Sequence, residues 1–188
     1  METSVKIGKQ EWTNSNLKVT KFSNGDLIPL AQNDEEWDKL GKERQPACAY
    51  FAYDSKNGEK LGLLYNWYAV TDKRGLAPDG WVVPSTKDWK LLLKEMGGVK
   101  VAGGELKKED AWEGEDNSNS SGFSAIPGGF HDEYGNDNCL DMYGCFWSTS
   151  IDGENDADYI MFSSYSNQVN VRVRGRAAGF SVRLIKSK

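Results

Sequence analysis

The sequence predicts an α+β fold, and two observations support this. Alternation of apolar and polar residues, which is typical of strands, occurs near the amino terminus and dominates the carboxyl-terminal half, whereas helical patterns are short and lie between. No tandem repeat, low-complexity linker or break in composition divides the 188 residues. That length suits one domain with a sizeable core, so we expect a single domain over residues 1–188.

The first elements expected are short strands joined by tight turns. Residues 5–12 predict a strand, a turn at Gly8 and the opening of a second strand. Residues 17–22 alternate and end at Asn24-Gly25, which is a strong signal for a tight turn. The aromatic-rich stretches 49–53 and 62–70 indicate extended chain or packed turns, and the polar stretch 107–121 indicates a loop.

Two short helices are predicted in the first half of the chain. The first spans residues 33–40, with Asn33 as its N-cap and Gly41 as its stop. Ser85 caps the second helix, Asp88 completes a capping box, and Gly97-Gly98 end it. Its apolar face consists of Trp89, Leu92, Leu93 and Met96.

Four strand signals follow, at 144–149, 158–163, 167–173 and 179–185. The third continues into the most regular pattern of the chain. A period of two places Val169, Val171 and Val173 on one face of a sheet. The opposite face then carries Asn170, Arg172, Arg174 and Arg176.

This row of guanidinium groups predicts a contact surface, because arginine forms bidentate pairs with carboxylate, sulfate or phosphate and stacks on sugar or aromatic faces. The alternative is a solvated edge, or a row paired with the acids just upstream. Those acids are Asp152, Glu154, Asp156 and Asp158.

A second set of candidate contact residues precedes the arginines. If Ile160 and Phe162 point inward, parity makes Tyr159, Met161 and Ser163 point outward. The alternative places Tyr159 and Met161 in the core. Tyrosine, serine and asparagine are frequent in adaptable recognition surfaces. The predicted ligand-binding set is Tyr159, Met161, Ser163, Tyr165, Asn170, Arg172, Arg174 and Arg176.

Charge and hydropathy exclude some partners. The net charge of −5 and pI near 5.0 give no reason to expect nucleic acid or an anionic membrane. We see no apolar run long enough to span a bilayer and no signal peptide, since Met1 leads directly into a strand-like segment. The three cysteines leave two alternatives open, a Cys139–Cys145 disulfide or free thiols that fill core space.

Catalytic and metal chemistry have little support in the residues. His131 is the single histidine, and its polar neighbours suggest a surface loop. Acidic loops at 110–116, 132–137 and 152–158 could hold calcium, although none has EF-hand spacing and solvated loops are the usual alternative. We expect no catalytic residue, cofactor or resident metal. Hydrolysis by a pair of loop carboxylates stays open, because sequence does not show their separation.

An ordered series of motifs resembles the Fibrobacter succinogenes major paralogous domain family over nearly the whole chain. The motifs include Asn24-Gly25-Asp26, Leu64-Tyr-Asn-Trp-Tyr-Ala-Val70, Pro78-x-Gly-Trp-x-Val-Pro84, Ser121-Gly-Phe-Ser-Ala125, Pro127-Gly-Gly129, Trp147-Ser148 and Gly179-Phe-Ser-Val-Arg183.

The resemblance implies a C-type-lectin-like fold, with two helices packed on a small, mostly antiparallel sheet and long loops over it. Members are mostly surface-exposed or secreted proteins of Bacteroidetes and related bacteria. Similar folds serve as variable proteins of diversity-generating retroelements, including phage receptor-binding proteins, whose diversified positions would correspond to residues 148–179.

This chain departs from related patterns in three respects. Cys145 stands where the family usually has tyrosine or another residue that is not cysteine. The sugar-binding motifs of calcium-dependent lectins are absent, as is any cysteine after Cys145 that formylglycine-generating chemistry would need.

We therefore expect a non-enzymatic recognition domain, extracellular or on the cell surface, that binds a protein or glycan ligand on a cell or host surface. A phage virion is the alternative location. A polysaccharide-acting hydrolase and a structural surface or virion module are the alternative functions.

Overall fold

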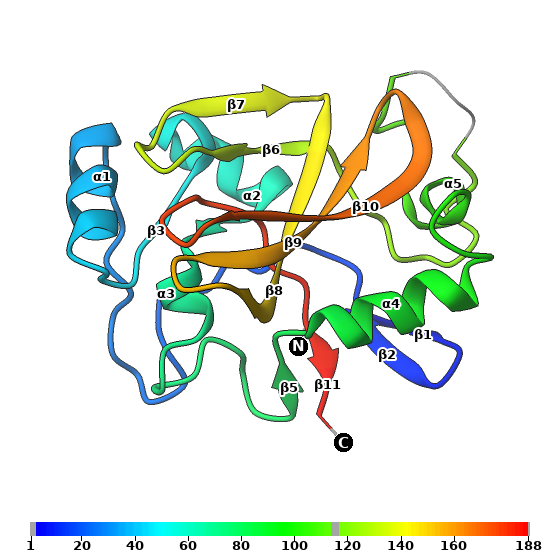
Figure 1. Ribbon diagram of the computed structural model, residues 1–188, viewed down its shortest axis with the longest axis horizontal. Helices are drawn as coiled ribbons and strands as arrows, with labels where there is room; N and C mark the ends of the chain where they lie inside the picture. The colour runs from blue at the N-terminus through cyan, green and yellow to red at the C-terminus, as the bar shows by residue number, and fades with distance from the viewer. Residues whose placement is uncertain (1–2, 114–116, 188) are drawn as a thin grey trace.

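A computed structural model describes residues 3–113 and 117–187 and shows an α+β arrangement of short helices and mostly antiparallel sheets (Figure 1). The strands are β1 (Ser4–Ile7), β2 (Gln10–Thr13), β3 (Cys48–Ala49), β4 (Leu64–Tyr65), β5 (Trp81–Val82), β6 (Gly128–His131), β7 (Asp137–Leu140), β8 (Tyr143–Asp152), β9 (Asp156–Ser163), β10 (Ser166–Gly175) and β11 (Ile185–Lys186). The α-helices are α1 (Asp34–Lys42), α2 (Gly58–Leu61), α3 (Trp67–Val70), α4 (Thr86–Glu95) and α5 (Ala102–Leu106), and the 3-10 helices are η1 (Phe51–Tyr53) and η2 (Ser55–Asn57).

One sheet joins the two ends of the chain. Its order is β1-β2-β11-β5, and Ile185 of β11 lies opposite both Trp12 of β2 and Val82 of β5. The β1–β2 hairpin turns at Gly8, whose φ of +58° favours glycine, so the first predicted hairpin is confirmed.

The second sheet contains the carboxyl-terminal strands in the order β10-β9-β8-β6-β7. Neighbouring strands are antiparallel except β6 and β8, which pair in parallel through Gly129 and Gly144. The three predicted strands at 144–149, 158–163 and 167–173 are confirmed, and each is longer than the pattern indicated. A two-stranded sheet, β3-β4, completes the set among the described residues.

Both predicted helices form with the predicted caps. The Asn33 side chain accepts a hydrogen bond from the Glu36 amide at 2.9 Å, and Ser85 and Asp88 form a reciprocal capping box. Gly41, predicted to stop α1, instead lies within it, at a point where a Cβ would come 2.9 Å from the Ala177 Cβ. These two helices are the longest of the described part of the chain, which also holds three short α-helices of four or five residues and sheets of two, four and five strands.

Two predicted strands do not form as continuous elements. Residues 17–22 make only an isolated bridge, Lys21 to Leu27, around the expected tight turn. Residues 179–184 exchange backbone hydrogen bonds with several segments in succession, including Phe180 with Tyr65 and Ser181 with Cys145. Because its partners change along its length, this segment connects the sheets and belongs to no single ladder until β11.

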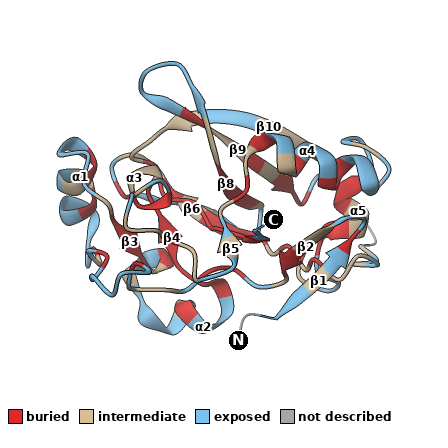
Figure 2. Cartoon of the chain, turned by 90° about the horizontal axis from the view of Figure 1, so that it is seen from below, coloured by how far each residue is buried: buried red, intermediate tan, exposed pale blue. Residues whose placement is uncertain are grey.

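The core lies on both faces of the β8–β9 pair. On one face Phe146 and Ile160 pack with Trp89 of α4, and on the other Trp147 packs with Phe180 at a ring-centroid distance of 4.5 Å. Figure 2 shows buried residues through the middle of the sheets and exposed ones over the outer helices and much of β10. Among the described residues, no helix has the length and apolar character needed to cross a membrane.

Most of the tryptophans are buried in the core, including two whose neighbours in the sequence are polar. Trp37 is completely buried and donates a hydrogen bond to the Ala177 carbonyl, and Trp112 is 8% exposed. Polar neighbours in sequence did not reveal this burial, because the residues that cover both rings come from distant segments.

Candidate functional site

The candidate site is a surface on the outer strands β9 and β10. Paired residues of neighbouring strands lie on the same face of a sheet. One cross-strand row is therefore Trp147, Tyr159 and Arg172, and the next is Cys145, Met161 and Asn170. Exposure increases along the first row towards the edge strand, from fully buried Trp147 through half-buried Tyr159 to exposed Arg172, and in the second row buried Cys145 is followed by half-buried Met161 and Asn170.

The period-two assignment of β10 agrees with this register. Val169 is buried, Val171 is half-buried and Val173 is 43% exposed, so the apolar face emerges from the core towards the end of the strand. Asn170, Arg172 and Arg174 share the opposite face, since they pair with Met161, Tyr159 and Ala157. The prediction of a valine face and a polar face is therefore correct, although the valines are not uniformly covered.

Arg172 is the arginine of the predicted row that can contact a ligand. Its side chain is exposed, and within residues 3–113 and 117–187 it has neither a hydrogen bond nor an ion pair. Its guanidinium group can form a bidentate pair with an incoming carboxylate or sulfate.

Arg174 is held by an internal ion pair. Its Nε and Nη2 donate to the two carboxylate oxygens of Glu133 at 2.7 and 2.9 Å, and the guanidinium lies 5.8 Å from the centre of the Phe130 ring. The hydrogen bonds to Glu133 raise the pKa of Arg174. The expectation of a free contact residue is wrong here. The alternative prediction, that the arginines pair with acids, is correct for Arg174, but its partner Glu133 is not one of the acids at 152–158.

Arg176 lies beyond the end of β10, so it does not continue the row. Its guanidinium stacks 4.6 Å from the centre of the Trp67 ring, and it donates to the carbonyl oxygens of Asp156 and Gly153 at 3.3 and 3.4 Å. These contacts link the β8–β9 hairpin to α3, so Arg176 has a structural role.

The expected outward orientation of Tyr159, Met161 and Ser163 needs correction. Ile160 and Phe162 are buried as predicted, but the opposite face is also packed. Tyr159 lies 4.4 Å from Phe180 between ring centres, and burial raises its pKa to about 12. Met161 is half-buried, and Ser163 is only 8% exposed.

Tyr165 extends the surface at the turn between β9 and β10. It is 68% exposed, and its ring meets Tyr143 edge-on at 6.4 Å. Since Tyr143 lies on the same face as Cys145 and Met161, Tyr165 adjoins that face. We call the following set the C-terminal face: Tyr159, Met161, Tyr165, Asn170 and Arg172.

The acidic loops show internal roles where the structure describes them. The Asp132 carboxylate accepts hydrogen bonds from the amides of Tyr134 and Asn136 and so stabilises its own loop. Within the described ranges, no group of three or more histidine, cysteine, aspartate or glutamate side chains is placed to hold a metal. Residues 114–116 of the candidate calcium loop 110–116 lie outside the described residues.

His131 is buried, contrary to the surface-loop expectation. Its Nε2 lies 2.8 Å from an Asp137 carboxylate oxygen without the alignment of a hydrogen bond, and the rings of Trp37 and Tyr53 pack against it. His131 is buried because it lies at the end of β6, where side chains of α1 and η1, from far earlier in the chain, pack against it.

All three cysteines are free thiols, so the second of the two alternatives holds. Cys48 and Cys145 are buried, and burial raises the pKa of Cys48 to about 12 and raises that of Cys145 as well. Cys139 is half-buried on β7.

Comparison with known proteins yields one family. The model of the Fibrobacter succinogenes major domain matches residues 5–186. Neither the curated proteins nor the solved structures contain a match to the chain.

Proposed function

The chain belongs to the Fibrobacter succinogenes major domain family, and on this premise we propose that it is a non-enzymatic recognition domain that binds a protein or glycan through the C-terminal face. The observation that carries the proposal is the exposed guanidinium of Arg172, which has no partner among the described residues and lies beside half-buried Tyr159 and Met161. We also propose that the fold is C-type-lectin-like and forms one domain over the whole chain.

The face combines a rigid support with adaptable contacts. Tyr159 and Met161 rest on the packed layer of Phe180 and Trp147, so little side-chain freedom remains to be lost when a ligand binds. Tyr165 and Asn170 add an exposed aromatic ring and an amide, which suit variable partners. Arg172 supplies charge and a planar group for carboxylate, sulfate or a sugar face.

The same region suits a variable surface. Residues 148–179 include the β8–β9 hairpin, the β9–β10 turn and the edge strand, where exposed side chains can change without disturbing Ile160 or Phe162 in the core. We propose diversification of this interval by a retroelement, in a protein displayed on a cell surface or a phage virion. A reverse transcriptase gene and a template repeat beside the gene, with adenine-specific differences in these codons, would support this extension; their absence removes it and leaves binding as proposed.

The direct test uses glycan and surface-protein arrays probed with the wild-type protein, followed by affinity measurements on each captured ligand. Arg172→Ala should weaken binding about tenfold or more, because a charge-assisted contact contributes about 1.5–3 kcal/mol. The matched control is Lys56→Ala, which also removes an exposed positive charge but lies on η2.

Three results would reject the proposal. Unchanged affinity of the Arg172→Ala protein for every captured ligand would remove the C-terminal face as the binding site. Release of product from a captured glycan would favour the hydrolase alternative. Sedimentation of an oligomer that buries residues 159–176 would favour an assembly module.

A further inference from the structure

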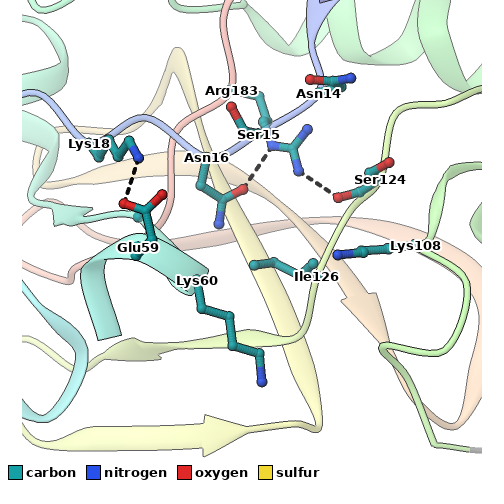
Figure 3. Close-up of a pocket in the computed structure, with 11 residues that line it drawn as sticks. Asn14, Ser15, Asn16, Lys18, Glu59, Lys60, Lys108, Ser124, Ile126 and Arg183 are labelled. Atoms are coloured by element: carbon teal, nitrogen blue, oxygen red, sulfur yellow. Dashed lines mark hydrogen bonds and ion pairs between the residues drawn. The ribbon is translucent and has the colours of Figure 1, made fainter. Parts of the chain in front are cut away.

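A second concave site lies away from the C-terminal face. It is a pocket of about 310 Å³ lined by residues 14–16 and 18, the end of α2 with Gly62, Lys108, Ser124, Ile126 and Arg183 (Figure 3). In Figure 2, α2 and β10 lie at opposite edges of the molecule, so a ligand in this pocket would not contact Arg172.

The pocket contains a buried cation whose partners among the described residues are all neutral. Arg183 is 1% exposed, and its guanidinium donates to the Asn16 side-chain oxygen at 2.8 Å and to the carbonyls of Thr13, Phe123 and Ser124 at 3.0, 2.6 and 2.7 Å. These bonds use four of the five N–H groups of a guanidinium. Over the described ranges, no carboxylate lies within ion-pair distance of Arg183.

The charge of Arg183 therefore has no counterion among the residues that the structure describes. Burial lowers its pKa to about 9, so the group stays protonated at neutral pH. A buried charge is costly when no opposite charge compensates it, and a bound anion in the pocket would provide that compensation.

Further cations surround the pocket. Lys108 and Lys60 are exposed, and neither side chain has a hydrogen bond or ion pair in the described part of the chain. Figure 3 shows the Lys108 ammonium group directed towards Ile126, whereas that of Lys60 extends away. The one acid of the lining, Glu59, pairs with Lys18 at 3.0 Å. Positive charge is thus in excess here, although the whole chain carries −5.

The remaining lining groups indicate the rest of the ligand. Asn14, Ser15 and Ser124 present amide and hydroxyl groups suited to hydroxylated ligands, and Ile126 presents an apolar surface. The volume is at the lower end of the range for ligand pockets, so it accommodates about one sugar unit.

We propose that this pocket binds the carboxylate of an acidic sugar, a hexuronate unit, with Lys108 and the free N–H of Arg183 as its anion contacts. The site is independent of the C-terminal face and would give the protein a second, charge-selective contact with an acidic polysaccharide.

The test is a titration of the isotopically labelled full chain with sodium glucuronate, glucose and sodium sulfate, followed through the backbone amide signals. Glucuronate should shift the signals of residues 14–18, 59–62 and 124–126 with a Kd in the millimolar range or below, while glucose should leave them unchanged. Lys108→Gln should weaken binding about tenfold.

Two controls separate this site from other effects. Lys87→Gln removes an exposed charge on α4, and Arg172→Ala alters the C-terminal face; both should bind glucuronate as the wild type does. Native dispersion of the amide signals of the Lys108→Gln protein establishes that it folds.

Three results would overturn the assignment: no shift of the pocket signals at about 20 mM glucuronate, equal affinity of the Lys108→Gln and wild-type proteins, or sulfate binding as tightly as glucuronate. If Lys108→Gln abolishes glucuronate binding, the proposal for the C-terminal face is unaffected. If Arg172→Ala abolishes binding of a ligand to the C-terminal face, the proposal for this pocket is unaffected.

Discussion

The ion pair between Arg174 and Glu133 should stabilise the fold measurably, and its energy can be derived from its geometry. Arg174→Met removes the charge and keeps an unbranched aliphatic side chain, and Glu133→Gln removes the opposite charge with little change in shape. A double-mutant cycle of these two changes isolates the energy of the pair.

The expected coupling energy is about 1 kcal/mol. Two parallel charge-assisted hydrogen bonds, at 2.7 and 2.9 Å, would contribute about 3 kcal/mol or more if fully buried. The side chains of Arg174 and Glu133 are 37% and 29% exposed, however, and solvent reduces pairs at the surface to about 0.2–1 kcal/mol. The bidentate geometry places this pair at the upper end of that lower range.

The assay is urea unfolding of the wild type, the two single variants and the double variant, followed by tryptophan fluorescence. The coupling should decrease at high salt, because half-exposed charges are screened. A coupling below about 0.3 kcal/mol, which is within the usual error of additivity, would show that Arg174 is not held by Glu133. Arg174 would then return to the set of free contact residues.

Two further predictions concern packing beneath the C-terminal face and thiol accessibility. Gly103→Ala should destabilise the protein by about 1–2 kcal/mol in urea unfolding. A Cβ there would come 2.6 Å from the Asn167 carbonyl oxygen of β10, and the cost of this overpacking exceeds the gain from the higher helix propensity of alanine. Gly104→Ala is the matched control and should lower the free energy of unfolding by less than about 0.5 kcal/mol, since the nearest atom to its Cβ would be in the side-chain amide of Asn167, at 3.2 Å. An equal loss of stability in both variants would contradict the close approach of α5 to β10. Ellman's reagent should label one thiol per native molecule, and Cys139→Ser should abolish that labelling, because the other two cysteines are buried; rapid labelling of more than one thiol in the native state would contradict this burial.

Features that depend on residues close in sequence were predictable. Ser85 and Asp88 are three residues apart, and this spacing alone determines their capping box. The side-chain alternation of β10 is equally local, so the separation of Val171 from Arg172 followed from period two before any partner strand was known.

The extent of the candidate face was not predictable in this way. Tyr159 is half-covered because Phe180 arrives from a segment that also bonds to Tyr65, and Arg174 is paired because the β6–β7 turn brings Glu133 beside it. A strand pattern indicates which side chains share a face, but it contains no information on what covers that face.

The sequence by itself therefore determined the α+β class, the two capped helices, the strands that carry the candidate face and the family of the chain. Only the tertiary structure decided that Arg172 is free, that Arg174 and Arg176 are held, and that Arg183 lies buried beside a pocket. The physical reason is that caps and periodicity arise from interactions between near neighbours along the chain. Coverage and charge pairing arise instead from contacts between distant segments, and these are defined only when the whole chain has packed.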